Sequence, residues 1–307
     1  MPDETAGTSR PAAAPLTALD ACWRQAHPLP DIGDGADKNA RGRALLVAGS
    51  ATVPGGPLLT GEALLRAGAG KVRIGTIAAA AMAIGALFPE AAIVPLATDE
   101  SGEIAAEAAA ALEKDVGRCD VLVMGPATMA RPHSATLVET LLRATAPETS
   151  ILLDAGALVA MHGKAAVLAR CGGRLLLTPH HGELATLLGC DEAEITAAPV
   201  DQALRAARLF GAAVVLKARE TIIADPSGTL LHYCSDAPGL GTAGSGDVLA
   251  GVIGGLLARG MDPLSAAGWG VWIHGEAGKM ASRTIGRVGF LARDLLPMIP
   301  ALVGPHG

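Results

Sequence analysis

Aromatic side chains, paired cysteines and long apolar runs are scarce or missing in this chain. Its 307 residues include three Phe, three Trp and one Tyr. A core with so few rings has to be built from aliphatic side chains, alanine and glycine in closely packed helices and sheet. The five cysteines are scattered, odd in number and form no C-x-x-C pair. This pattern argues against both a zinc site and a disulfide framework, and it fits a reducing compartment.

Positive charge is also sparse. The formal net charge is −6 and no basic tract occurs, so nucleic acid and anionic membranes are not expected as partners. Residues Met1 to Glu4 begin acidic and lack the basic-then-apolar pattern of a signal peptide. The most apolar window, Ile77 to Leu87, is alanine-rich and too short to span a bilayer. We therefore expect a soluble, cytoplasmic protein.

Short apolar segments of strand type alternate with helical segments along the chain. This alternation predicts one α/β domain with a central, mostly parallel sheet flanked by helices on both faces. Residues 1–15, rich in Ala, Pro and Thr, are expected to form a disordered tail, and residues 16–307 the folded domain. The predicted strands are 44–48, 72–74, 121–124, 151–153, 175–177, 214–216, 221–224 and 230–232. The predicted helices are 58–67, 104–116, 137–144, 183–188, 202–210 and 248–258.

Residues that directly follow the predicted strands are candidates for the site, because ligands of such sheets bind beyond the carboxyl ends of the strands. These residues are Gly49, Ser50, Gly125, Pro126, Asp154, Thr178, Pro179, His180 and Lys217.

The segment GTAGSGDVLAG (241–251) carries the strongest functional signal. Gly244, Ser245 and Gly246 stand at the start of an apolar helix, where bare backbone N–H groups form a seat for phosphate. Asp247 would repel a bound anion, but a carboxylate is useful there if it takes a proton from a hydroxyl that attacks phosphorus. The segment therefore indicates phosphoryl transfer, with an anion hole beside a base.

The pattern G-x-G-x-x-G also occurs here, at Gly239 to Gly244. A dinucleotide-binding fingerprint belongs directly after a strand, usually the first of the sheet. This one follows a loop near the C-terminus, so a dinucleotide-binding Rossmann fold is not favoured.

Other polar segments allow two interpretations each. The segment Lys217 to Thr221 is either a solvated turn or a source of charge and hydrogen bonds for a nucleotide. His180 is either a contact to substrate or a helix cap, and Asp154 either an N-cap or a polar group that faces the cleft. His274 is expected to be a satisfied interior histidine. No cluster with metal-ligand spacing is present, so no metal site is predicted in the protein itself.

In order and spacing, these segments resemble the ribokinase-like superfamily and, within it, the ADP-dependent (S)-NAD(P)H-hydrate dehydratases, the family of the C-terminal half of bifunctional NAD(P)H-hydrate repair enzymes. The similarity extends from about Lys38 to Pro300. It is carried by LLVAGSATVPGGPLLTGEALLRAGAGKVRI (45–74), FPEA (88–91), LLLTPHHGELATLLG (175–189), VVLKARETIIADPSG (214–228), GTAGSGDVLAGVIGGLLARG (241–260) and WIHGEAGKMA (272–281).

The resemblance implies a hydro-lyase that repairs NADH or NADPH to which water has been added. ADP would donate a phosphoryl group to the hydroxyl, Mg²⁺ would screen the diphosphate, and loss of phosphate would restore the dinucleotide and leave AMP. The implied partner is thus the small-molecule hydrate, and a homo-oligomer is expected by analogy. The implied catalytic residues are Asp247, Gly244, Ser245 and Gly246; the nucleotide-binding residues are Lys217, Ala218, Arg219, Glu220, Thr221 and Gly246; the hydrate-binding residues are Gly56, Gly125, Met129, His180 and Asp247.

The chain departs from the family pattern on the substrate side. Gly56 stands where alanine is usual, and the usual G-P-G-L-G is Gly125-Pro126-Ala127-Thr128-Met129. The usual D-A-D is Asp154-Ala155-Gly156, and the usual K-G is Lys217-Ala218. These changes leave two alternatives open. One is a small-molecule kinase of the same superfamily, acting on a sugar, hydroxymethylpyrimidine or thiazole alcohol. The other is a nucleotide-binding protein without catalysis.

Overall fold

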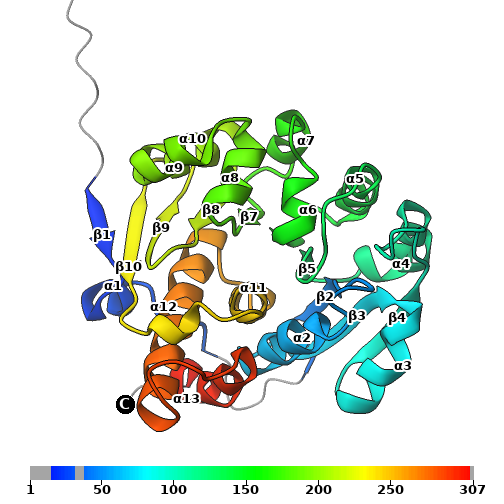
Figure 1. The fold of residues 1–307 in the computed structure, drawn as a ribbon, viewed down its shortest axis with the longest axis horizontal. Coiled ribbons are helices and arrows are strands. Elements are labelled where there is room, and N and C mark those ends of the chain that lie inside the picture. Colours follow the sequence, from blue (N-terminus) through cyan, green and yellow to red (C-terminus); the bar gives the residue numbers. More distant parts are fainter. Residues whose placement is uncertain (1–14, 32–37, 305–307) are drawn as a thin grey trace, which may run out of the picture.

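A mostly parallel sheet runs through the molecule and confirms the predicted α/β class (Figure 1). The structure is a computed structural model that describes residues 15–31 and 38–304. Ten strands of these residues pair in the order β1-β10-β9-β8-β7-β6-β5-β2-β3-β4. The strands are β1 (Leu16–Ala18), β2 (Arg43–Val47), β3 (Lys71–Ile77), β4 (Ala92–Leu96), β5 (Val121–Met124), β6 (Ser150–Leu153), β7 (Leu175–Leu177), β8 (Ala213–Leu216), β9 (Glu220–Ala224) and β10 (Leu230–Cys234).

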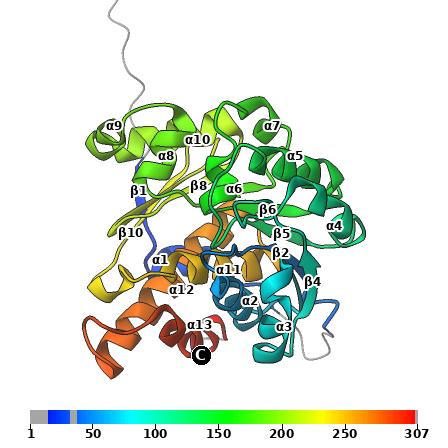
Figure 2. The same ribbon diagram turned by 45° about the vertical axis from the view of Figure 1, so that its right-hand side comes forward.

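Helices cover both faces of this sheet, as expected from its continuously apolar strands. In both ribbon views α10, α7, α5 and α4 lie on one side, and α2, α11, α12 and α13 on the other (Figure 2). The α-helices are α1 (Ala21–Ala26), α2 (Gly56–Arg66), α3 (Ala78–Leu87), α4 (Ala109–Val116), α5 (Ser134–Ala144), α6 (Ala155–Val159), α7 (Ala165–Ala169), α8 (His181–Leu188), α9 (Glu192–Ala197), α10 (Pro199–Phe210), α11 (Ser245–Ala258), α12 (Pro263–Thr284) and α13 (Ile299–Val303). Short 3₁₀ helices are η1 (Ala106–Ala108), η2 (Pro238–Leu240) and η3 (Ala292–Met298). None of the helices in the described ranges is long and apolar enough to cross a membrane.

The order of the strands creates a switch point between β2 and β5. From β2 the chain adds β3 and β4 on one side, then returns and adds β5 to β8 on the other, all in parallel. The loops that leave β2 and β5 therefore diverge, and a hydrogen bond from Gly49 N to Pro126 O (3.0 Å) ties them together. Ligands of parallel sheets bind at such a point.

Glycines in α11 let this helix approach α2 closely. A Cβ on Gly251 would lie 2.5 Å from the carbonyl oxygen of Thr60 and 2.6 Å from the Cβ of Ala63. A Cβ on Gly255 would lie 2.6 Å from the carbonyl oxygen of Leu64. This packing gives a core poor in aromatic rings its density, and it brings together the N-terminal ends of the two helices.

The predicted elements are largely confirmed, with differences at the edges. Every predicted strand is present, and Asp225 closes the predicted turn between β9 and β10 by accepting hydrogen bonds from Gly228 N and Thr229 N. The helix predicted over 104–116 begins later, because Ile104 pairs with Thr98 in a β-bridge. The sequence analysis did not identify β1 and β4. The predicted disordered tail, residues 1–15, lies outside the described residues except for Pro15.

Candidate active site

The predicted site residues come together at the carboxyl ends of β5 to β8, opposite the start of α11. Asp154 directly follows β6, and Thr178 directly follows β7. Lys217 directly follows β8, and its N–H donates to Pro179 O (2.8 Å). Asp247 lies in the first turn of α11 and faces this row of strand ends. The structure thus brings the proposed base, the carboxyl edge of the sheet and the predicted anion hole together.

The start of α11 has the geometry of an anion seat. Gly244 caps the helix in a left-handed conformation, with φ +85°, which is why a glycine is favoured there. Ser245 and Gly246 then begin the first turn. Ser245 N donates to Thr242 O (3.2 Å), whereas the N–H of Gly246 lies at the positive end of the helix dipole. The ammonium of Lys217 lies over this turn, since a Cβ on Gly246 would be 3.7 Å from its Nζ. Positive potential from both sources meets at one place, which suits a phosphate.

Asp247 is held in an environment that favours its neutral form near neutral pH. Burial, with the neighbouring charge of Asp154 adding to it, raises the pKa of Asp247 to about 7. Lys217 and the backbone N–H of Ala127 favour the carboxylate and limit this rise. A carboxyl group with a pKa close to the working pH both accepts and returns a proton efficiently. This pKa therefore suits Asp247 for proton transfer.

Lys217 is surrounded by carboxylates rather than by solvent. Its Nζ lies 2.7 Å from Oδ1 of Asp154 and 3.7 Å from Oε2 of Glu183. Burial alone would lower the pKa of Lys217, but these two carboxylates outweigh it and raise that pKa above the usual value. Asp154 is 2% exposed and also accepts a hydrogen bond from Thr178 Oγ1 (2.7 Å). Asp154 occupies the N-cap position of α6 without a side-chain capping bond, so its carboxylate serves Lys217 and Thr178 rather than the helix end.

His274 is buried, as expected, yet it touches the anion seat. Its Nε2 lies 2.9 Å from Ser245 Oγ and 3.0 Å from the carbonyl oxygen of Ser245. Burial lowers the pKa of His274 to about 4, so the ring is neutral at physiological pH. A neutral imidazole holds Ser245 without adding charge to the cleft.

The remaining predicted nucleotide and substrate residues lie around this centre. Ala218, Arg219 and Glu220 are exposed, whereas Thr221 is 9% exposed and donates from Oγ1 to Ala218 O (2.9 Å). His180 is the N-cap of α8: its Nδ1 accepts from Glu183 N (3.3 Å).

The capping role of His180 leaves most of its ring available. The His180 side chain is 59% exposed, so a contact between its ring and a substrate is sterically open. Contact of His180 with the hydrate stays a prediction.

Apart from Ala218, the positions that depart from the expected family pattern lie against one another. A Cβ on Gly56 would overlap the Cβ of Ala127, and a Cβ on Gly156 would lie 2.6 Å from Thr128 Oγ1 and 2.7 Å from the carbonyl carbon of Met129. The loop of residues 127–129 thus fills the space that side chains at 56 and 156 would need. These residues therefore form one wall.

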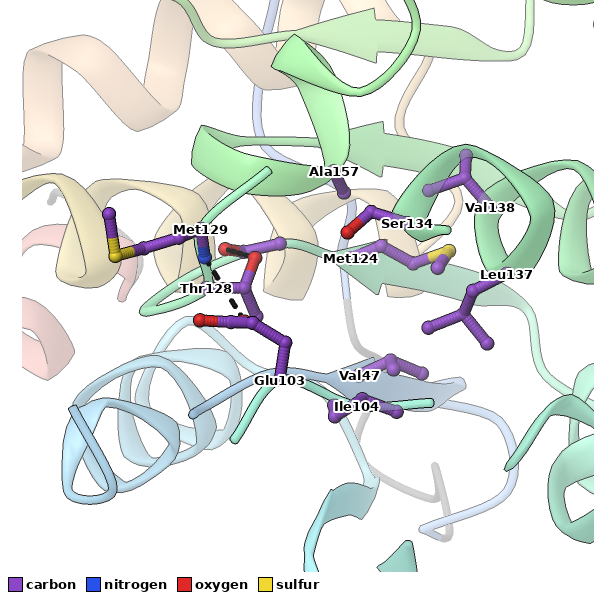
Figure 3. Close-up of a pocket in the computed structure, with 11 residues that line it drawn as sticks. Val47, Glu103, Ile104, Met124, Thr128, Met129, Ser134, Leu137, Val138 and Ala157 are labelled. Atoms are coloured by element: carbon purple, nitrogen blue, oxygen red, sulfur yellow. Dashed lines mark hydrogen bonds between the residues drawn. The ribbon is translucent and has the colours of Figure 1, made fainter. Parts of the chain in front are cut away.

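A small cavity of about 30 Å³ lies behind this wall (Figure 3). It is lined mainly by apolar side chains together with Glu103, which is 3% exposed and accepts a hydrogen bond from Met129 N (3.2 Å). The Met129 side chain is 50% exposed and points away from the cavity (Figure 3). Gly125 also lines the cavity and is buried, with φ +106°. Met129 therefore lies at the rim of the loop rather than in its interior.

The sequence analysis did not predict three contacts within the site. Thr178 donates to Asp154, and Glu183 lies near Lys217. Glu103 accepts a hydrogen bond from Met129 N. Thr178 was a candidate for the site because it follows a predicted strand, but its hydrogen-bond partner was not predicted. Glu183 looked like a simple helix start, and nothing in the local sequence distinguishes Glu103.

Comparison with known proteins identifies the family of this chain. The family model described as NAD(P)H-hydrate dehydratase matches residues 44–301. The ADP-dependent (S)-NAD(P)H-hydrate dehydratase of Xanthomonas campestris is 43% identical over 288 residues, which cover 94% of this chain and 96% of that protein. The ADP/ATP-dependent NAD(P)H-hydrate dehydratase of Bacillus subtilis, co-crystallized with ATP/Mg²⁺, has a TM-score of 0.78 at 26% identity over 94% of this chain and 98% of that one.

A ribokinase-like superfamily protein of Enterococcus faecalis shares the fold, with a TM-score of 0.80 at 22% identity over 94% of this chain and 95% of that one. The family model spans more than half of the chain and includes every element of the cleft. This chain therefore belongs to the NAD(P)H-hydrate dehydratase family and has the ribokinase-like fold.

Proposed function

We propose that this protein uses ADP to dehydrate (S)-NAD(P)H hydrate, with Asp247 as the base. The observation that carries the proposal is the position of Asp247. Its carboxyl group has a pKa of about 7 and stands beside the positive end of α11 and the ammonium of Lys217. Binding a nucleotide gains nothing from an acid at this place, whereas activating a hydroxyl for attack on phosphorus requires one.

The proposed reaction has two steps. In the first, Asp247 takes the proton of the hydrate's hydroxyl as its oxygen attacks the β-phosphorus of ADP, and AMP leaves. In the second, inorganic phosphate leaves the ring carbon, assisted by the lone pair of the ring nitrogen. Loss of a proton from the neighbouring carbon then restores the double bond of NADH or NADPH. Hydroxide leaves poorly, so the phosphoryl group serves to make a leaving group of it.

The chain's own groups support the first step electrostatically. The N–H of Gly246 at the start of α11 and the ammonium of Lys217 face negative charge that grows on the transferred phosphoryl group. When phosphate binds, Lys217 is shared between it and Asp154. His274 keeps Ser245 in place without repelling Lys217 by a second positive charge.

A magnesium ion fits this cleft as part of the nucleotide. In the described part of the chain no group of three or more His, Cys, Asp or Glu side chains could hold a metal ion. Mg²⁺ in phosphoryl-transfer sites usually keeps several waters and binds substrate phosphates rather than an all-protein cage. Bound in that way, it would screen the diphosphate charge. We assign no protein ligand to it.

A direct assay tests the proposal. The protein is incubated with ADP, Mg²⁺ and hydrated NADH, and the near-ultraviolet absorbance of the reduced nicotinamide is followed while AMP and phosphate are quantified. Absorbance should return with one AMP and one phosphate per dinucleotide. The Asp247→Asn variant should lower kcat by about 10²- to 10⁴-fold and still bind AMP.

Other outcomes would contradict particular parts of the proposal. Full activity of the Asp247→Asn variant would exclude Asp247 as the base. No recovery of absorbance, combined with ATP-dependent phosphorylation of a sugar, pyrimidine or thiazole alcohol, would replace the dehydratase by a kinase. AMP binding without turnover of any of these substrates would indicate a nucleotide-binding protein.

A further inference from the structure

The N–H of Gly246, in the first turn of α11, has no hydrogen-bond acceptor among the residues that the structure describes. In the same turn, the N–H groups of Ser245 and Val248 donate to backbone carbonyls that precede the helix (3.2 and 3.1 Å). The first N–H groups of a helix lack intrahelical partners and need an acceptor from outside it. The ammonium of Lys217 lies beside Gly246, so a negatively charged acceptor is favoured at this N–H.

The peptide unit that carries this N–H is held at its other end by His274. The carbonyl group of Ser245 and the N–H of Gly246 belong to one planar, trans peptide unit and point in opposite directions. Nε2 of His274 lies 3.0 Å from the carbonyl oxygen, because α12 packs against α11 (Figures 1 and 2). A bond that fixes the carbonyl group therefore also fixes the direction of the N–H.

This contact determines which ring nitrogen of His274 carries the proton. A carbonyl oxygen only accepts hydrogen bonds, so Nε2 donates to Ser245 O. A bare Nε2 would instead set its lone pair against a lone pair of the oxygen. Ser245 Oγ, 2.9 Å from the same nitrogen, is then a second acceptor of this N–H. Burial lowers the pKa of His274 to about 4, so the neutral ring has one proton, and that proton is on Nε2.

The start of α11 has little else to hold it. Its N-cap is Gly244, and no side chain makes a capping bond there. Within the described ranges, the bond from His274 to Ser245 O is the one side-chain hydrogen bond to the backbone of this turn. Helix ends without such restraints fray. A bond accepted by the carbonyl also polarises the peptide unit, which strengthens its N–H as a donor.

We propose that His274 is a positioning residue for the N–H of Gly246. By donating from Nε2 to the Ser245 carbonyl, it orients and polarises the peptide unit whose N–H meets the transferred phosphoryl group. The ring takes no proton in the reaction and acts only through the backbone of residues 245 and 246. This inference rests on the proposed binding of a phosphoryl group at the start of α11.

Three variants separate the N–H of the ring from its bulk. His274→Phe keeps a ring but removes the donor, and His274→Gln keeps an N–H near the position of Nε2. His232→Phe is the matched control. His232 is a partly buried residue of β10, and its Nδ1 bonds to no group in the described part of the chain.

Isotope labelling isolates the peptide unit in question. The pair Ser-Gly occurs three times in the chain, at 101–102, 227–228 and 245–246. Carbon-13 at the serine carbonyl combined with nitrogen-15 in glycine therefore reports three amides, of which Gly102 and Gly228 are internal references. Spectra are recorded with and without ADP and Mg²⁺, and ADP affinity is measured by calorimetry. The hydrate is left out, so neither measurement needs turnover.

In the wild type, ADP should shift the Gly246 amide proton downfield, because a phosphate oxygen becomes its acceptor. In His274→Phe this shift should fall by at least half, and ADP affinity should fall about tenfold. In the dehydratase assay kcat should also fall about tenfold, while the KM for the hydrate stays unchanged. His274→Gln should recover at least half of each loss, and His232→Phe should match the wild type.

Three results would overturn the role of His274. The first is a wild-type ring whose Nε2 carries no proton, read from the nitrogen-15 signals of labelled histidine. The second is a His274→Phe protein whose Gly246 amide responds to ADP as in the wild type. The third is a His274→Gln protein that recovers nothing, because packing of the ring would then matter rather than its N–H. If His274→Phe does not fold, His274→Asn replaces it under the same criteria, since its shorter amide does not reach the carbonyl.

Failure of the proposed function would give a different pattern. If the wild type binds ADP at Gly246 but does not turn over hydrated dinucleotide, the dehydratase proposal fails, and the labelled amides still decide the role of His274. If the Gly246 amide of the wild type does not respond to ADP, the role of His274 is excluded, because no phosphoryl group then meets this N–H.

Discussion

The ammonium nitrogen of Lys217 lies 2.7 Å from Oδ1 of Asp154, at the carboxyl edge of the sheet. The two residues directly follow strands β8 and β6, with β7 between these strands. The same ammonium lowers the pKa of Asp247 across the cleft, while Asp154 raises it. One ion pair therefore sets the balance of charge that the proposed base experiences.

Replacing Lys217 by glutamine should make the proposed base harder to ionise. Lys217→Gln keeps a hydrogen-bond donor for Asp154 but removes the positive charge that favours ionised Asp247. We expect the pH at half-maximal kcat/KM to rise by about one unit. AMP affinity, measured by calorimetry, should fall at least about tenfold, because a charge-assisted bond to phosphate is lost.

A matched control for this substitution is Lys164→Gln. Lys164 also pairs with a carboxylate, Glu139, at 2.6 Å, but on the surface of the molecule. This variant should retain the pH profile and AMP affinity of the wild type. An unchanged midpoint and affinity in Lys217→Gln would contradict the role given to Lys217.

The wild-type enzyme should gain activity as the pH rises through about 7. The proposed base works as the carboxylate, and the pKa of Asp247 is about 7. Below that value log kcat/KM should increase by about one for each pH unit, and above it should level off. A profile that is flat from about pH 5 to 8 would show that no group with this pKa is needed in its ionised form.

Asp247→Asn should stabilise the fold above neutral pH even as it removes activity. The folded-state pKa of Asp247 is raised from 3.8 to about 7, so the folded protein holds its proton more tightly than the unfolded chain does. The stability this provides is complete below about pH 4 and is lost as the pH rises through about 7. Asparagine is not subject to that loss. At about pH 8 the variant should be more stable by roughly 2–4 kcal/mol, measured by urea unfolding.

The pH dependence of that gain distinguishes it from a general packing effect. Near pH 4, close to the pKa of 3.8 that Asp247 has in the unfolded chain, little of this difference in proton binding has yet cost stability, so the variant and the wild type should unfold at similar urea concentrations. A gain of equal size at both pH values would contradict the assignment of the raised pKa to Asp247.

The sheet and the location of its site follow from local patterns, whereas the partners within the site do not. Apolar segments ending in Asp154 or Lys217 could be predicted as strands that stop at a cleft, because strand length and turn residues are local properties. Strand β4 was missed because Pro95 interrupts its pattern; as the edge strand it needs no donor on its free side.

Contacts between distant segments could not be predicted from one sequence. Ser245 and His274 are separated by 29 residues and meet because α12 packs against α11. Gly56 was marked as a departure from the family, but its relation to Ala127 depends on where the start of α2 meets the loop after β5. Local patterns specify elements, whereas these pairs depend on how the elements pack.

His274 should destabilise the fold in mild acid, most visibly once Asp247 is replaced. The folded-state pKa of His274 is lowered from 6.5 to about 4, so the unfolded chain binds its proton more readily between these values. Stability from this residue is therefore present above about pH 6.5 and is lost as the pH falls toward 4. In the wild type, Asp247 adds stability as the pH falls, and this gain offsets the loss from His274.

The measurement compares Asp247→Asn with Asp247→Asn/His274→Gln. From about pH 7 to about pH 4.5, the single variant should lose roughly 2 kcal/mol more stability than the double variant. Equal losses in the two proteins would show that His274 does not titrate abnormally.

The close approach of α11 to α2 predicts that Gly251 tolerates no methyl group. Gly251→Ala would place a Cβ 2.5 Å from the carbonyl oxygen of Thr60, and relieving the overlap by shifting backbone should cost roughly 1–3 kcal/mol after the better helix propensity of alanine is counted. Gly117→Ala is the control, because its Cβ meets only Glu113 O at 3.6 Å; it should change stability by less than about 1 kcal/mol. Urea unfolding of both variants measures the difference. Because the overlap lies close to the start of both helices, Gly251→Ala should also weaken AMP binding. Equal stability of Gly251→Ala and Gly117→Ala would contradict the packing described for α11.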